Sequence, residues 1–205
     1  SPKEEAIKEF CRMRRSIMTE LKTAKQVLLA FLLRQGKHFD GKSYWTGEHR
    51  RWLKEISFEQ PYLQEAFDEY VISVNELEAR LKRIENRLEE IAKDEEVEAK
   101  VKKLICFCGI DTLTAVSIVS EVGDFMRFAR AWDFANFVGL SVGERSSGGK
   151  ERHLGITKSG NCYLRRLFME SAKSIKKTNV KFKKSKRLLD RQKGNDPKVI
   201  AYADK

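Results

Sequence analysis

An unbroken heptad pattern in the middle of the chain constrains the fold more than any other sequence feature. Its apolar residues recur in alternating steps of three and four: Phe67, Tyr70, Val74, Leu77, Leu81, Ile84, Leu88 and Ile91. A helix with this spacing carries one continuous apolar stripe, which a second helix has to cover. The residues Ser57-Phe58-Glu59-Gln60 have the form of a capping box, and Pro61 suits a first helical turn. We therefore expect a long helix that begins near Pro61.

A second heptad stripe lies at the start of the chain. It is interrupted by Arg14 and otherwise consists of Ile7, Phe10, Ile17, Leu21, Ala24, Leu28 and Phe31. This spacing predicts a first helix over residues 2–34. Three glycines between residues 36 and 47 then predict a loop, followed by a short helix near residues 48–55.

The charges beside the central stripe leave two partners for it open. Glu78 and Glu85 take heptad position e, whereas Arg80 and Arg87 take position g. In a parallel pair Arg80 would meet Glu85 of the partner, but in an antiparallel self-pair like charges would face each other. The pattern fits a parallel homodimer or packing against the chain's own first helix. We predict self-association through Phe67–Ile91, as a dimer or tetramer.

Beyond Glu96 the helical segments become shorter and glycines more frequent. No alternating strand pattern is visible, so we predict an all-α fold with at most a short hairpin around residues 141–156. The expected domains are a coiled-coil dimerisation region at 1–97, a compact helical domain at 98–180 and a basic helical tail at 181–205.

Basic residues concentrate in the last quarter of the chain. Residues 150–205 contain 17 Lys and Arg against 5 Asp and Glu, whereas residues 1–149 contain 24 against 25. Such a concentrated positive field favours phosphate contacts, so we expect salt-sensitive binding of DNA or structured RNA through residues 150–191. The alternative is a basic tail that only keeps a structural coiled coil in solution.

Other features exclude several classes of protein. No apolar run approaches the roughly 20 residues of a membrane span, and the N-terminus is charged from the start, unlike a signal peptide. We therefore expect a cytoplasmic protein with no membrane partner. The four cysteines form no CxxC pair, so no zinc site is expected: Cys11, Cys106, Cys108 and Cys162.

Residues 104–115 predict two helices joined by a tight turn at Gly109. Asp111 or Thr112 can cap the second helix. The segment resembles a helix-hairpin-helix, whose turn offers backbone N–H groups to a DNA phosphate at a helix N-terminus. The usual hairpin has a glycine where Asp111 stands, and a plain helical corner is the alternative.

The aromatic residues Phe125, Phe128, Trp132, Phe134 and Phe137 follow at helical spacing. We interpret them as a core stripe rather than as a platform for stacked bases.

A loop with two serines comes next. Ser146 and Ser147 precede two glycines, and Lys150 and Arg152 follow them, with His153 as a further candidate contact. Glycines let the backbone approach a phosphate closely, and cations stabilise the charge that builds up when a serine hydroxyl attacks phosphorus. A merely flexible loop would have the same composition.

The segment after this loop carries further cations. Lys158 lies in a Gly-rich stretch, Asn161 is a good N-cap for the next helix, and Arg165 and Arg166 can reach phosphate or pair with core acids.

Taken together, three ordered segments resemble one family. They are CGIDTLTAVSIVSEVGDFMRF, FANFVGL and SSGGKERHLGITKSGNCYLRRL, preceded by LLRQGKHFDGKSYWTGEHRRWL and the heptad helix. In this order they are similar to the coiled-coil region and C-terminal domain of DEDD-type insertion-sequence transposases, the relatives of the Piv DNA invertase. Asp111 departs from that pattern, because the family's hairpin commonly has a glycine there.

The resemblance implies an enzyme that cuts and rejoins DNA to move an insertion element in the bacterial or archaeal nucleoid. Members carry an N-terminal RuvC-like domain with four acidic metal ligands, which has no counterpart in this chain. Mg²⁺ is therefore expected only in that missing domain, with no cofactor in this fragment, whose activity on its own is left open.

In some members a guide RNA encoded in the element pairs with target and donor DNA, and a serine of the C-terminal domain becomes covalently linked to DNA. The matching residue is Ser147. The predicted contacts to nucleic acid are made by Gly109, Lys150, Arg152, His153, Lys158, Asn161, Arg165 and Arg166. The alternative function is a non-catalytic helix-hairpin-helix module that binds nucleic acid and oligomerises through its coiled coil.

Overall fold

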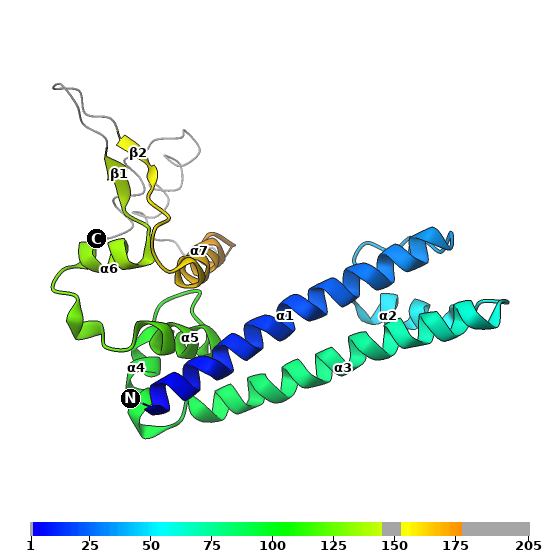
Figure 1. The fold of residues 1–205 in the computed structure, drawn as a ribbon, viewed down its shortest axis with the longest axis horizontal. Coiled ribbons are helices and arrows are strands. Elements are labelled where there is room, and N and C mark those ends of the chain that lie inside the picture. Colours follow the sequence, from blue (N-terminus) through cyan, green and yellow to red (C-terminus); the bar gives the residue numbers. More distant parts are fainter. Residues whose placement is uncertain (1, 145–152, 178–205) are drawn as a thin grey trace. The chain divides into compact units, whose positions relative to one another are not determined.

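The computed structural model describes residues 2–144 and 153–177. These residues are mostly helical, which confirms the predicted all-α class, and the predicted short hairpin is present (Figure 1). The elements are α1 (Pro2–Arg34), α2 (Gly47–Glu55), α3 (Pro61–Ile91), α4 (Glu95–Ile105), α5 (Thr112–Val122), the 3₁₀ turn η1 (Phe125–Arg127), α6 (Ala131–Val138), β1 (Val142–Glu144), β2 (His153–Ile156) and α7 (Cys162–Lys177).

The chain packs as two compact units. One consists of residues 9–88, and the other combines residues 1–8 with the chain from residue 89 onward. The sequence placed a boundary near residue 97 instead. Lys3 accounts for part of the difference, because its ammonium lies 2.7 Å from the Asp94 carboxylate and ties the start of α1 to the segment before α4.

The unit of residues 9–88 is a helical hairpin. In Figure 1 its two long helices, α1 and α3, run side by side in opposite directions, with α2 beside them. Their apolar stripes meet in one core, formed by the buried side chains of Leu21, Leu28, Phe31, Leu32, Leu53, Phe67 and Val74. Every residue of the α3 stripe from Phe67 to Leu88 is buried or half-buried. Within the hairpin the stripe thus packs against the chain's own first helix, and self-association through it stays an untested prediction.

Two acidic residues beside the α3 stripe, Glu78 and Glu85, form ion pairs inside this hairpin. Arg14, which interrupts the α1 stripe, binds Glu85 through two nitrogens at 2.7 and 2.9 Å. Glu78 accepts from Lys25 and Arg50 at 2.7 and 2.8 Å. Burial acts to raise the pKa of Glu78, but the hydrogen bonds from the two cations outweigh it and keep that pKa below its usual range. Arg14 and Lys25 thus link α1 to α3, whereas Arg50 links α2 to α3.

The start of α3 differs from the predicted capping box. The helix begins at Pro61 as expected, but Ser57 lies too far upstream to cap it. Gln60 does so instead, since its side-chain oxygen accepts from the Leu63 N–H at 2.9 Å. Gln64 accepts from the Phe58 N–H at 3.0 Å and holds the preceding loop.

The second unit has its own core around α5, α6 and α7. Ile118, Val122, Val138 and Leu164 are buried there, and Phe125, Phe128, Phe134 and Phe137 pack against them. Trp132 is the exception to the predicted core stripe, because it is 47% exposed. It stands two residues before Phe134 on α6, which places it on the opposite side of that helix.

Candidate nucleic-acid interface

The serine loop is bracketed by the only strands in the described part of the chain. β1 and β2 pair antiparallel, with Val142 opposite Ile156 and Glu144 opposite His153. Ser146, Ser147, Lys150 and Arg152 fall between these strands and lie outside the described residues, so their predicted roles are untested. His153 is the first residue of β2.

The pairing of the two strands continues below them as a ladder of backbone hydrogen bonds. Thr157 donates to the Ser141 carbonyl at 2.9 Å, Lys158 to Gly139 at 3.2 Å and Asn161 to Phe137 at 3.1 Å. The segment before the serine loop and the segment after it are therefore hydrogen-bonded to each other, as far out as the pair of Phe137 and Asn161. A loop closed by such a ladder has fixed ends.

Two glycines make this close approach possible. Gly139 ends α6 with a φ of 75°, in the left-handed region that favours glycine. A Cβ at Gly160 would collide with the backbone carbonyl oxygen of Phe137 and lie 2.6 Å from the Gly139 nitrogen. The two segments can thus cross only where side chains are missing, which the sequence analysis did not foresee although both glycines are visible in it.

Asn161 has the structural role that the sequence predicted. Its side-chain oxygen caps α7 by accepting from the Tyr163 and Leu164 N–H groups at 3.0 and 3.1 Å. Its amide nitrogen donates to the Glu121 carboxylate at 2.9 Å. Direct contact with nucleic acid would compete with these bonds, and that prediction is untested.

Glu121 was missed by the sequence analysis. Its side chain is only 7% exposed and also lies 3.8 Å from the Lys8 ammonium. A buried carboxylate needs such partners. The available signal was its position as the one charged residue within α5.

The predicted phosphate contacts on α7 divide into two kinds. Arg165 is half-buried and donates to the Val138 carbonyl at 3.0 Å, so it fastens α7 to the end of α6. Arg166 and Lys158 are exposed, and Lys158 has a φ of 55° in the turn before α7. Of the predicted contacts that are described with their side chains, these two are the cations available to a phosphate.

The hairpin of α4 and α5 is present, but its turn is engaged within the protein. Gly109 has a φ of 88°, and a Cβ there would collide with the Ser171 carbonyl oxygen of α7. The Asp111 carboxylate accepts from the Thr114 N–H at 2.7 Å and so occupies the N-terminus of α5. Both features fit a packed helical corner, and the phosphate-binding role of Gly109 stays an untested prediction.

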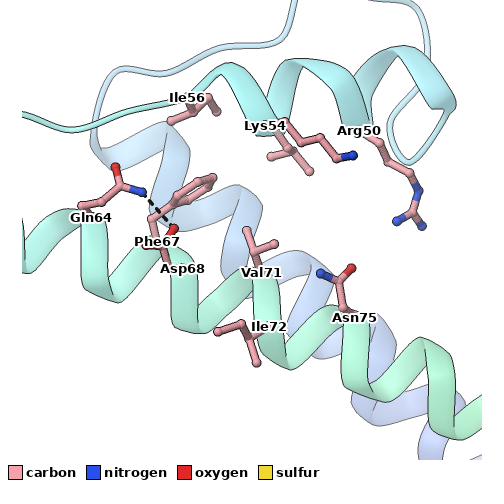
Figure 2. A pocket seen from close by; sticks show the side chains of 10 residues that line it. Arg50, Lys54, Ile56, Gln64, Phe67, Asp68, Val71, Ile72 and Asn75 are labelled. Carbon is pink, nitrogen blue, oxygen red and sulfur yellow. Dashed lines mark hydrogen bonds between the residues drawn. The ribbon is translucent and has the colours of Figure 1, made fainter.

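A groove of about 790 Å³ lies between α2 and α3 in the other unit. Figure 2 shows Arg50 and Lys54 on its α2 side and Val71 and Ile72 on its α3 side. Arg50 is bound to Glu78, as described above. Gln64, another lining residue, donates to the Asp68 carboxylate at 2.8 Å, so part of the polar lining is engaged within the chain and we assign no chemistry to this groove.

The described residues contain no group of three or more His, Cys, Asp or Glu side chains arranged to hold a metal ion. Within the same residues no helix combines the length and apolarity that a bilayer crossing requires. The four cysteines are not joined by disulfides, and Cys11 alone is buried.

Comparison with known proteins finds a family similarity in the C-terminal region. Residues 101–187 match the family model described as "Transposase IS116/IS110/IS902 family". This segment includes α5, the bracketing strands, the serine loop and α7. Residues 101–187 are thus similar to the transposase domain that this model describes.

Curated relatives agree over a larger part of the chain. It is 34% identical to the candidate transposase y4qE of Sinorhizobium fredii over 82% of its own length and 40% of the relative's. It is 38% identical to the transposase for insertion sequence element IS1533 of Leptospira borgpetersenii over 60% of its length and 36% of the relative's. It is 35% identical to the transposase for insertion sequence element IS1111A of Coxiella burnetii over 59% of its length and 34% of the relative's. The chain thus matches at most about two fifths of these relatives' length.

Proposed function

We propose that this chain is the DNA-handling C-terminal part of an insertion-element transposase, in which Ser147 attacks DNA. The observation that carries the proposal is that the transposase domain at residues 101–187 encloses the serine loop, whose two ends the backbone ladder holds together. Glu144 and His153, the described residues on either side of the loop, are paired with each other, so both ends of the loop lie at one place in the unit.

In the proposed step the Ser147 hydroxyl oxygen bonds to phosphorus while a phosphorus–oxygen bond of the DNA backbone breaks. The hydroxyl proton passes to a base, and the departing sugar oxygen takes up a proton. Attack by a second DNA hydroxyl on the serine phosphodiester then rejoins the strands and restores the serine. Lys150, Arg152 and the exposed Lys158 would stabilise the charge on the non-bridging oxygens.

Further properties follow from the resemblance to DEDD-type transposases. We propose that Mg²⁺ belongs to acidic ligands of a separate RuvC-like domain, and no step is assigned to a metal in the described residues, which offer no such ligand group. DNA is the proposed substrate, and a guide RNA is a proposed partner. We also propose that the protein acts as a homo-oligomer in the nucleoid.

The decisive experiment compares Ser147→Ala with Ser146→Ala in full-length protein, supplied with its guide RNA if it uses one. Ser147→Ala should bind DNA normally but give no protein–DNA adduct and no recombinant product, a loss of several orders of magnitude. Ser146→Ala is the matched control and should retain both products. If Ser147→Ala recombines normally, Ser147 is not the nucleophile.

The same experiment tests the alternative of a non-catalytic binding module. Such a module would bind DNA in the wild type and in both variants, and none of the three would form an adduct. The packed turn at Gly109 gives this alternative no support from the described geometry.

A further inference from the structure

A second, smaller cavity of about 260 Å³ lies within the hairpin unit, where the end of α1, the following loop and α2 meet. One wall consists of aliphatic side chains of α1, including Leu32 and the 69% exposed Leu33. Three further lining residues are aromatic, with Phe39 and Tyr44 from the loop and Trp52 from α2. Apolar side chains, several of them flat rings, thus make up most of the lining.

The three aromatic rings of the lining all lie close to the ring of one buried histidine, His49. His49 is 0% exposed, and the Phe39, Tyr44 and Trp52 rings lie 4.9, 5.1 and 5.4 Å from it. Among the residues that the structure describes, neither ring nitrogen of His49 finds a hydrogen-bond partner. Burying an unpartnered imidazole costs free energy, where an apolar side chain could fill the same core position without that cost.

The backbone beside these rings is strained as well. Trp45 adopts a φ of 66°, in a region that is costly for a bulky side chain. Strained backbone and unsatisfied groups gather where a binding surface has to keep a particular shape. Their presence around one aromatic cavity points to a ligand.

The surroundings of the cavity are basic. Residues 34–54 contain six Lys and Arg against two Asp and Glu. Lys37 and His38 belong to the lining and are exposed. Arg34 and Lys42, also exposed, form no ion pair within the part of the chain that the structure describes. An anionic group attached to the occupant would therefore be attracted.

We propose that this cavity binds one unpaired nucleobase of a single-stranded nucleic acid, with its phosphate beside Lys37. Aromatic rings next to cations are the combination that binds single strands, since every base has a face that can stack. Tyr44 is 45% exposed and offers the accessible ring, and the apolar wall with Leu33 would cover the base. The inference rests on the proposed function only in that the protein handles nucleic acid.

The test measures equilibrium binding of labelled oligonucleotides to the whole 205-residue chain. Single-stranded RNA, single-stranded DNA and a duplex of the same length are compared for wild type, Tyr44→Ala and Tyr44→Phe. Tyr44→Ala should weaken binding of single strands about tenfold and leave duplex binding unchanged, because stacking is lost. Tyr44→Phe should bind like wild type. Tyr62→Ala is the matched control, since Tyr62 is 75% exposed on α3 and lines no part of the cavity.

A second variant covers the case in which Tyr44→Ala does not fold. Leu33→Asp places a carboxylate in the exposed wall and should weaken single-strand binding similarly, whereas Val27→Asp, at a 39% exposed α1 position, should not. Photo-crosslinking of a thio-substituted base should map to Tyr44 or Trp52. A preference for RNA or for DNA identifies the natural strand, and either one supports the site.

The inference is overturned if Tyr44→Ala and Leu33→Asp bind single strands as tightly as their controls. It is also overturned if crosslinks occur only in residues 153–177. Lys158→Ala and Arg166→Ala report separately on the C-terminal interface. Loss of binding in those variants alone would leave the proposed function standing without this site.

Discussion

Asn161 donates a hydrogen bond from its amide nitrogen to the Glu121 carboxylate across 2.9 Å, joining the start of α7 to the end of α5. The same asparagine caps α7, and its backbone N–H belongs to the ladder under the serine loop. One residue therefore couples the core of the C-terminal unit to the segment that follows the serine loop.

Asn161→Ala should lower the free energy of unfolding by about 1–2 kcal/mol, since it removes the cap and one partner of a buried carboxylate. Urea denaturation of wild type, Asn161→Ala, Glu121→Gln and the double variant measures the coupling between the two residues. Glu170→Ala, which removes an exposed ion pair with Lys173, is the control and should change stability by less than about 0.5 kcal/mol. Additive effects of the two single changes would contradict the coupling.

Gly160→Ala should destabilise the protein by about 1–3 kcal/mol, because the new methyl group meets the Phe137 carbonyl in a crossing that cannot widen without breaking the ladder. Gly155→Ala is the matched control in β2, where a Cβ would meet nothing within 4 Å. Thermal unfolding compares the two variants. Equal melting temperatures would show that the crossing is not tight in solution.

His49 should make the stability of the hairpin depend on pH. Burial lowers the pKa of His49 below its ordinary 6.5, and the neighbouring Arg50 acts in the same direction. The unfolded chain therefore binds a proton at this position more readily than the folded chain does. The stability that neutral, buried His49 gives the folded chain is complete above pH 6.5. It is lost as the pH falls from 6.5 toward the lower pKa that His49 has in the folded chain.

The prediction for His49 is checked by measuring the free energy of unfolding from about pH 7.5 to about pH 5, a range that brackets the ordinary histidine pKa. Wild type should lose stability on acidification more steeply than His49→Phe. His38→Phe is the control, because His38 is exposed and should leave the slope unchanged. A slope that is identical in wild type and His49→Phe would refute the prediction.

Binding of DNA through the C-terminal region should weaken steeply between about 50 and 200 mM salt, as the basic segment 150–191 displaces counterions. The plot of log affinity against log salt concentration has a negative slope. Lys158→Ala and Arg166→Ala should each make this slope shallower by about one. Arg83→Ala, an exposed cation of α3, should leave the slope as it is. Affinity that does not change with salt would exclude phosphate contacts as its source.

The sequence by itself determined the helices, because their apolar spacing, caps and glycine breaks are local. It predicted the extents of α1, α2 and α3 closely, allowed a short hairpin around residues 141–156 and predicted the cap at Asn161. The ordered motifs from Cys108 to Leu167 were sufficient to indicate a transposase domain, which the family match supports.

Only the tertiary structure decided which elements meet. The heptad pattern alone fits two partners for the α3 stripe equally. In the folded chain the stripe packs against α1, and Arg14 and Glu85 pair across that interface. The tertiary structure paired Glu121 with Asn161 over 40 residues and brought Gly160 against Phe137. It also enclosed His49 in aromatic rings. These contacts join residues far apart in the chain, and no local spacing encodes them, because they arise only when separate helices pack together.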